Sequence, residues 1–350
     1  MENQEQPKHV RRKRYKGTHP KAYHEKYKEL NPEQYAADVE KIKEQGKTPA
    51  GMHRSICVDE IMEFLCISPG QTGMDATLGY GGHSLEILKR LQPNGRLFAT
   101  DVDPFELPKT EQRLRSLGFG EDMLFVRKMN FSHIDAIVAE SGPLDFVLAD
   151  LGVSSMQIDN PHRGFSFKVE GPLDLRLNPK SGIPASELLS TISQKTLETI
   201  LILNSDEPYA QPIAETISTR VMGGISIETT TQLKELVEEA LQFIPKQQRR
   251  DEVKKSCQRV FQALRIEVND EFEVLDTFLE KLPDALASGG RVAILSFHSG
   301  EDRRVKKSFQ QLFREGVYSE VASGPVRPSA QEYNTNPRAR SAKLRWAIKA

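Results

Sequence analysis

Hydrophobic positions follow two rhythms between residues 52 and 151. Apolar residues first recur at the spacing of one helix face, at Val58, Ile61, Met62 and Leu65. This predicted helix ends at the turn Ser68-Pro69-Gly70. Apolar runs of strand length follow at 73–78, 96–101, 123–128 and 144–151, with helical patterns at 84–91 and 134–140 between them. Strands that alternate with helices predict an α/β fold with a doubly wound parallel sheet.

The alternation stops near residue 157. Helical patterns without a strand occupy 184–192, 194–203, 212–221 and 230–243. The sheet pattern resumes with a long helix at 261–282, a strand at 289–297, a helix at 303–313 and a strand at 342–348. We therefore predict a helical domain, 157–260, inserted into a sheet domain formed by 51–156 and 261–350, in agreement with about two domains for this length. Residues 1–50 form a polar, basic extension, with a helix expected near 31–45.

Composition excludes several classes of protein. No apolar run reaches 18 residues, and no apolar segment follows the polar start, so neither a membrane span nor a secretion signal is expected. The cysteines, Cys57, Cys66 and Cys257, are odd in number and form no C-x-x-C pair. This usage favours the reducing cytoplasm and argues against a cysteine-based zinc site.

The net charge of −1 conceals an uneven distribution. Residues 1–50 carry +4, residues 246–259 carry +4 and residues 303–349 carry +8. The rest of the chain is acidic. The small total therefore excludes a uniformly basic coat, but it leaves RNA open as a partner.

A glycine-rich segment joins the strand at 73–78 to the next helix. Glycines in such a turn let a ligand approach the backbone closely, and the helix supplies unpaired N–H groups. The dinucleotide fingerprint Gly-x-Gly-x-x-Gly is incomplete, because Ser84 stands at its third glycine. S-adenosylmethionine carries a sulfonium and an ammonium group that would suit the carboxylate of Asp75. A turn without a ligand stays the alternative.

Polar or aromatic residues also end the next strands. Asp101 can accept hydrogen bonds from both ribose hydroxyls of an adenosine, while Asp103 can cap the following helix. Phe131 can pack on adenine or belong to the core. Asp150 ends the fourth strand, at the edge of the sheet where ligands bind.

Seven ordered blocks give the chain a close resemblance to the bacterial small-subunit ribosomal RNA methyltransferase H family, the MraW family. They are DATLGYGGHS at 75–84, DLGVSS at 150–155 with Gln157, RGFSF at 163–167, GPLDLR at 171–176, RVFQALRI at 259–266, SFHSGEDR at 296–303 and NPRARSAKLR at 336–345. The resemblance covers about residues 52–350. Tyr80 departs from it, because a small or variable residue is common there. Residues 1–50 resemble only a subset of the family.

The resemblance implies a Rossmann-like methyltransferase sheet with an inserted helical domain. It also implies transfer of a methyl group from S-adenosyl-L-methionine to N4 of a cytosine in the decoding region of 16S rRNA. The cofactor contacts that we expect from the residues and the resemblance together are Asp75, Gly79, Gly81, Gly82, His83, Asp101, Phe131, Asp150 and Gln157. The small ribosomal subunit is the expected partner, and a homodimer stays open.

The chemistry narrows the catalytic candidates. The lone pair of a cytosine N4 amine is delocalised, so N4 needs acceptors that draw on its protons and finally a base. We expect Asp150, or a carbonyl beside it, to accept from N4. Candidates for holding the target base are Ser154, Ser155, Asp174, Arg176, Ser296 and His298, and His298 could itself be the base. Alternatively, Asp174 and Arg176 form a structural ion pair, and His298 holds a loop.

The target base must be single-stranded or turned out of its stack. Arg163, Phe165, Phe167 and Arg176 are expected to line the RNA cleft, with Arg303, Arg338 and Arg340 as further RNA contacts. Alternatively, Phe165 and Phe167 anchor a loop in the core. Rival functions are methylation of another RNA site, a non-catalytic role in ribosome assembly and, less well supported by the glycine loop, a nicotinamide-dependent dehydrogenase.

Overall fold

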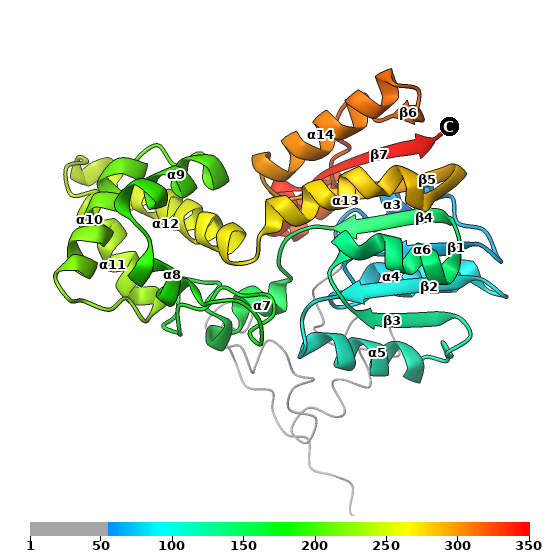
Figure 1. Cartoon of the computed structure of the whole chain (residues 1–350), viewed down its shortest axis with the longest axis horizontal. Coiled ribbons are helices and arrows are strands. Elements are labelled where there is room, and N and C mark those ends of the chain that lie inside the picture. Colours follow the sequence, from blue (N-terminus) through cyan, green and yellow to red (C-terminus); the bar gives the residue numbers. More distant parts are fainter. Residues whose placement is uncertain (1–54) are drawn as a thin grey trace, which may run out of the picture. The chain divides into compact units, whose positions relative to one another are not determined.

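Seven strands form one sheet within residues 55–350, the part of the chain that the computed structural model describes (Figure 1). Their bounds are β1 Thr72–Asp75, β2 Arg96–Asp101, β3 Leu124–Lys128, β4 Leu144–Asp150, β5 Leu286–Ser296, β6 Tyr318–Val321 and β7 Lys343–Lys349. The order is β3-β2-β1-β4-β5-β7-β6. Strands β1 to β5 pair in parallel, and β7 runs antiparallel to both of its neighbours. The predicted α/β doubly wound sheet is confirmed.

Buried side chains alternate between the two faces of this sheet. In β4, Phe146 and Leu148 pack with helices α3, α4 and α5. The neighbouring Val147 and Ala149 pack instead with α6, α13 and α14. Because successive side chains of a strand point to opposite faces, helices on both sides require strands that are apolar throughout. The apolar strand pattern of the sequence has this cause.

The helices of the described residues connect and cover these strands. They are α3 Val58–Leu65, α4 Gly82–Leu91, α5 Glu106–Ser116, α6 Ile134–Ser141, α7 Ser155–Asp159, α8 Ala185–Thr191, α9 Gln194–Ser205, α10 Ala210–Met222, α11 Thr230–Ala240, α12 Lys246–Val268, α13 Glu271–Ala285, α14 Ser299–Arg314 and α15 Ala330–Thr335. Short 3-10 turns occur at Phe131–His133, Pro161–Arg163 and Pro337–Ser341. The extension predicted at 1–50 lies outside the described residues.

Helices α8 to α12 lie between β4 and β5 in the chain, and they share a hydrophobic core. Its fully buried members include Leu189, Leu201, Ile213, Leu233 and Val260. Figure 1 shows these helices gathered at one end of the described part of the chain. An inserted helical domain stays a prediction, because residues Ser55–Ala350 cluster as one unit. The boundary that we expect at residue 261 falls inside α12, whose Phe261 still packs in the helical core.

The long helix predicted over 261–282 is wrong. Two helices occupy this stretch, and Asn269 and Asp270 separate them. Asp270 adopts a left-handed backbone conformation with φ of 50°. The side chain of Asn269 donates to Leu175 O at 2.8 Å and accepts from Leu177 N at 2.7 Å. A long-range contact thus fixes the break, and no glycine or proline marks it in the sequence.

The Asn269 contacts generate a stability prediction. Replacing Asn269 by Ala leaves a carbonyl and an N–H of the 175–177 segment without their partners, at a cost of about 1–3 kcal/mol. Urea denaturation should show a lower midpoint with an unchanged slope. Glu280→Ala, an exposed change on α13, is the control and should stay within about 0.5 kcal/mol of the parent. Equal midpoints for the two variants would contradict the assignment.

Candidate active site

The strand order reverses between β1 and β4, and carboxylates lie at the ends of both strands. Asp75 is the last residue of β1 and Asp150 the last residue of β4. The backbone N–H of Asp150 donates to Thr77 Oγ1 at 2.7 Å, which joins the two strand ends. Ligands of open α/β sheets bind in the crevice outside such a switch point. The predicted position of the site therefore agrees with the topology.

Asp75 is held inside the protein. Its side chain is 1% exposed and accepts from Ser84 Oγ at 2.6 Å and from Thr77 N at 3.1 Å. Burial raises the pKa of Asp75, and these hydrogen bonds only partly offset that rise. Ser84, which breaks the dinucleotide fingerprint, thus serves to hold a buried carboxylate.

The glycine loop is held against the end of β2. Gly81 caps α4 in the left-handed region, with φ of 69°, and a Cβ there would lie 2.7 Å from Thr110 Cγ2. Gly79 N donates to Asp101 Oδ2 at 2.7 Å, and Thr110 Oγ1 donates to Gly79 O at 2.7 Å. The close packing explains why this segment needs glycine.

The two acids after β2 have different surroundings. Asp101 accepts from the N–H groups of Gly79 and Asp103, while burial raises its pKa to about 6. Asp103 accepts from Phe105 N at 2.9 Å and Glu106 N at 3.2 Å at the start of α5. The geometry therefore gives Asp103 the capping role and leaves Asp101 at the strand end, as the sequence indicates.

Asp103 is also the centre of a buried ion pair. Its Oδ2 accepts from Arg163 at 2.7 Å and from Gln157 Nε2 at 2.8 Å. Burial acts to raise the pKa of Asp103, but the hydrogen bonds from Arg163 and Gln157 outweigh it and leave the pKa below its ordinary value. This pair links the turn after β2 to the segment that follows β4.

Asp150 is partly exposed and has a raised pKa. Its side chain is 29% exposed, and its Oδ2 lies 3.6 Å from His83 Nδ1. Burial raises the pKa of Asp150 to about 6, the charge of His83 acts to lower it, and Asp75 and Glu301 act to raise it. A carboxylate with this pKa is largely ionised at neutral pH yet more basic than an ordinary aspartate.

His298 is engaged by its own helix. It caps α14, where Nδ1 accepts from Glu301 N at 3.4 Å and Nε2 lies 3.1 Å from Glu301 Oε1. Burial acts to raise the pKa of Glu301, but His298 and Arg265 outweigh it and lower the pKa. Both ring nitrogens thus face groups of the protein, which favours the loop-holding alternative for His298 over a role as base.

The family model of the MraW methylase family matches residues 50–350. The chain belongs to this methylase family. The methyl donor of the family is S-adenosyl-L-methionine, as the sequence indicates.

Two curated relatives in other bacteria support this assignment. A protein of Alkaliphilus metalliredigens named "Ribosomal RNA small subunit methyltransferase H 2" is 66% identical and covers 100% of both chains. One of Thioalkalivibrio sulfidiphilus named "Ribosomal RNA small subunit methyltransferase H" is 39% identical and covers 85% of this chain and 98% of its own. Among solved structures, a SAM-dependent methyltransferase from Aquifex aeolicus has 10% identity and a TM-score of 0.37, covering 84% of this chain and 90% of its own.

The residues of this methylase at the switch point fit S-adenosyl-L-methionine. Asp75 and Asp103 act to raise the pKa of Asp101, and Asp75 does the same for Asp150, so the site gathers negative charge. Such a site suits a sulfonium and an ammonium group. Each carboxylate oxygen of Asp101 accepts one N–H bond and keeps acceptor capacity for a ribose hydroxyl. Tyr80, the departure from the family pattern, lies under the Arg113 guanidinium at 3.9 Å.

Several residues expected in the RNA cleft or against the cofactor are buried or half-buried and pack against other parts of the protein. Arg163 is 7% exposed and, besides Asp103, donates to two carbonyls, so it is not free to contact RNA. Phe165 is buried in the helical core, and Phe167 packs edge-on against Phe261. Phe131 packs edge-on against Phe278 in the sheet domain. The alternative that the sequence left open, a loop anchored in the core, describes the 163–167 segment.

Other predicted residues have local partners. Arg176 pairs with Asp174 through two hydrogen bonds of 2.7 and 2.9 Å, which supports the structural alternative. Ser154 and Gln157 form a capping box on α7, beside Ser155. The remaining partners are Lys343 O for Ser296, Asp206 for Arg303, Asp159 for Arg338 and the Tyr333 ring for Arg340.

Sequence reasoning missed Thr77, Glu301 and the carbonyl of Ile56 as members of the site. Thr77 and Glu301 stand inside matched blocks, so the spacing alone could have flagged them. The carbonyl of Ile56 lies 3.0 Å from His83 Nε2, a contact that leaves no mark in the sequence.

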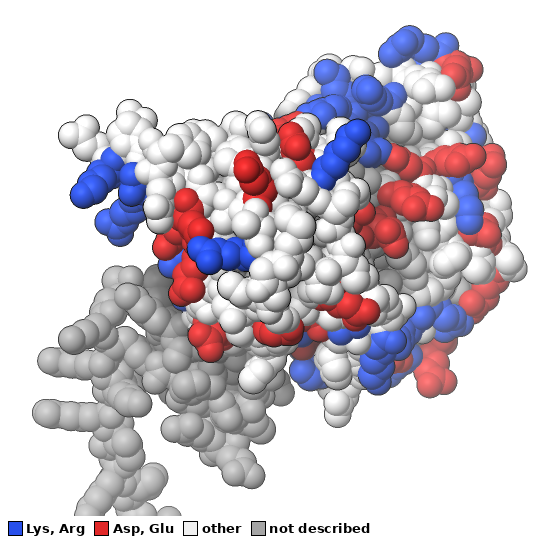
Figure 2. All heavy atoms as spheres, turned by 60° about the vertical axis from the view of Figure 1, so that its left-hand side comes forward, with Lys and Arg blue, Asp and Glu red and all other residues white. Residues whose placement is uncertain are grey.

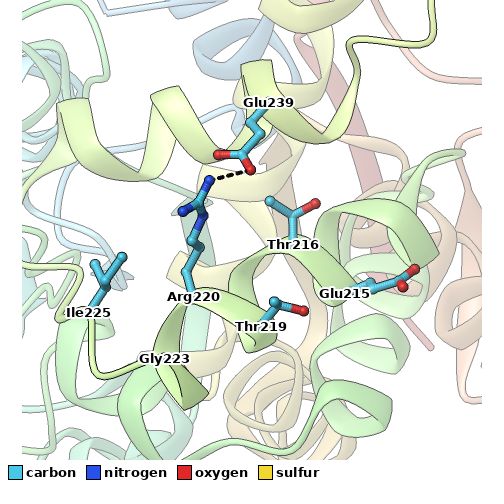
Figure 3. A pocket seen from close by; sticks show the side chains of 7 residues that line it. All are labelled: Glu215, Thr216, Thr219, Arg220, Gly223, Ile225 and Glu239. Carbon is cyan, nitrogen blue, oxygen red and sulfur yellow. Dashed lines mark hydrogen bonds and ion pairs between the residues drawn. The ribbon is translucent and has the colours of Figure 1, made fainter.

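A hollow of about 500 Å³ lies between α10 and α11 (Figure 3). The pair Arg220–Glu239 spans the two helices there. No predicted site residue lines this hollow, so it adds nothing to the candidate active site. Separately, none of the helices in the described part of the chain is long and apolar enough to cross a membrane.

The position of Arg163 reverses the expectation for its replacement. Arg163→Ala leaves Asp103 buried without its cation, and loss of one partner of a buried pair costs about 3–5 kcal/mol. We expect a large drop in the unfolding midpoint, measured by thermal and urea denaturation. Arg327→Ala, which removes an exposed arginine that donates to Ala342 O, is the control and should cost less. An unchanged midpoint together with weaker RNA binding would restore the RNA-cleft interpretation.

Proposed function

We propose that this methylase transfers a methyl group from S-adenosyl-L-methionine to N4 of a cytosine in the decoding region of 16S ribosomal RNA. Names of relatives support the coarser part: they print ribosomal RNA small subunit methyltransferase H. The observation that carries the finer part is Asp150, a partly exposed carboxylate of raised pKa at the switch point. It matches what an exocyclic amine needs, an acceptor that ends as a base.

The residues of the chain have separate tasks in this proposal. When bound, S-adenosyl-L-methionine supplies a methyl carbon whose bond to sulfur breaks as the amine attacks. Asp101 and the glycine loop orient the adenosine, and the buried Asp75 holds the start of helix α4 through Ser84. Asp150 accepts a hydrogen bond from N4, which directs the nitrogen lone pair toward the methyl carbon, and then takes the proton.

Methylation of purified small subunits, followed by mapping of the modified base, tests the function. We expect Asp150→Asn to lower the rate by about 10²–10⁴-fold while cofactor binding by calorimetry persists. In the parent, the rate should fall as the pH drops through about 6, because protonated Asp150 accepts no further proton.

Asp135→Asn is the matched control, because Asp135 is an exposed partner of Lys281 on α6. It should leave the rate unchanged. A modified base at another rRNA position would favour the rival target, and a fully active Asp150→Asn variant would overturn the role of Asp150.

Helix α14 offers a surface for the RNA backbone. Lys306, Lys307 and Arg314 are exposed, and no ion pair within residues 55–350 involves them. Lys307 and Arg314 lie seven residues apart, on one face and about 10 Å along the helix. Figure 2 shows Lys and Arg gathered in the upper part of the view, where α14 lies in Figure 1. Unpaired like charges on one helix face repel, which an RNA phosphate backbone would relieve.

Reversing two of these charges should weaken RNA binding. We expect Lys307→Glu with Arg314→Glu to lower the affinity for small-subunit rRNA and to reduce the slope of log K against log salt by about 2, since each phosphate contact contributes about 1. Binding titrations at four salt concentrations measure both. Lys89→Glu with Lys109→Glu, which reverses exposed charges on α4 and α5, is the control. Equal slopes in the two double variants would remove α14 from the interface.

A further inference from the structure

His83 lies between a backbone carbonyl and the proposed base. Its Nε2 is 3.0 Å from the carbonyl oxygen of Ile56, and its Nδ1 is 3.6 Å from Asp150 Oδ2. A carbonyl oxygen only accepts hydrogen bonds, so Nε2 must carry the proton. The ring is 5% exposed, and the tautomer is therefore fixed by the protein rather than by solvent.

This tautomer creates a conflict that one proton removes. A neutral ring with its proton on Nε2 turns the Nδ1 lone pair toward the Asp150 carboxylate. Two electron pairs then face each other across 3.6 Å. A proton on either atom turns this repulsion into attraction.

We propose that His83 and Asp150 hold one proton between them, and that His83 is a positioning residue that keeps Asp150 ionised and aimed at the amine. The inference rests on the proposed function of Asp150 and goes beyond the cofactor contact expected of His83. In the resting pair the proton resides on Nδ1, so the ring is cationic and Asp150 is an anion.

The charge on His83 compensates the negative charges around Asp150. Asp75 from β1 and Glu301 from α14 both act to raise the pKa of Asp150, and only His83 acts to lower it. The Cys57 thiol, at the start of α3, also senses Asp150, but burial raises its pKa, so it stays neutral. The cation on His83 therefore lowers the pKa of Asp150 against three effects that raise it: burial, Asp75 and Glu301.

The proton count closes over one turnover. The N4 lone pair forms the bond to the methyl carbon, and the electron pair of the broken carbon–sulfur bond leaves on the sulfur, which becomes a neutral thioether. N4 is then positively charged and gives one proton to Asp150. The pair now holds two protons and releases one to water, which restores the resting state.

The pH dependence of the rate separates this role from a purely structural one. His83→Gln keeps an amide that can donate to Ile56 O but removes the group that faces Asp150. We expect the acid limb of kcat to move upward by about one pH unit, so that the rate falls about fivefold at pH 6 and recovers at pH 8.5. His83→Asn, which keeps a neutral donor near Nδ1, should shift the limb less. A loss of rate that is equal at all pH values would overturn the proposal.

Nitrogen-15 NMR of labelled histidine in the parent protein tests the resting state directly. Nδ1 of His83, identified by the signal missing in His83→Gln, should be protonated at pH 7. An unprotonated Nδ1 beside an ionised Asp150 would overturn the shared proton. If Asp150→Asn stays active, the proposed function of Asp150 fails; if it is inactive but the His83→Gln profile is unshifted, only the role of His83 fails.

Discussion

Four carboxylates crowd one edge of the sheet, and the protein must prevent their mutual repulsion from opening the site. Asp75, Asp101, Asp103 and Asp150 end or follow β1, β2 and β4. Each has a different compensation. Asp75 accepts from a hydroxyl and an N–H, Asp101 from two N–H groups, Asp103 from an arginine and an amide, and Asp150 faces a histidine. These contacts do not fully offset the cost of burying Asp75, Asp101 and Asp150, so the pKa of each of these three acids is raised.

Asp103 is the one acid of the four whose pKa is lowered, and the residue that compensates its charge also links two parts of the structure. The cation that balances it, Arg163, comes from the segment leading into helices α8 to α12, and the same guanidinium holds Arg176 O and Leu177 O. A second contact from this segment, Asn269 with Leu175 and Leu177, ties it to the end of α12. The turn that presents Asp101 is thus coupled to the helical part through two hydrogen-bonded residues. Removing one member of such a buried polar network leaves its partners unpaired, which makes each of them costly to replace.

The sequence predicted the sheet and the cofactor edge because both have local causes. Apolar runs of strand length mark β1 to β5, and Asp101 and Asp150 stand at strand ends where topology alone places ligands. The helix break at Asn269 could not be predicted, because its partners lie 92 and 94 residues away. Arg163 was misplaced for the same reason: a cation beside two aromatics resembles a nucleic-acid contact until Asp103, 60 residues earlier, is brought against it. Helix α5 was not predicted from the sequence, because it has few apolar positions.

In the proposed function Asp150 is the base for an exocyclic amine; such a base must satisfy two opposed requirements, and the surroundings of Asp150 meet both. An ordinary aspartate is ionised at neutral pH but too weakly basic to draw a proton from N4, whereas a deeply buried one would bind its own proton and accept no other. Burial together with Asp75 and Glu301 raises the basicity of Asp150, and His83 limits that rise, so the pKa is about 6. The carbonyl of Ile56 accepts a hydrogen bond from Nε2 of His83, which leaves Nδ1 of the same ring facing the Asp150 carboxylate. A backbone atom outside the sheet therefore orients the ring that, in our proposal, limits the basicity of Asp150.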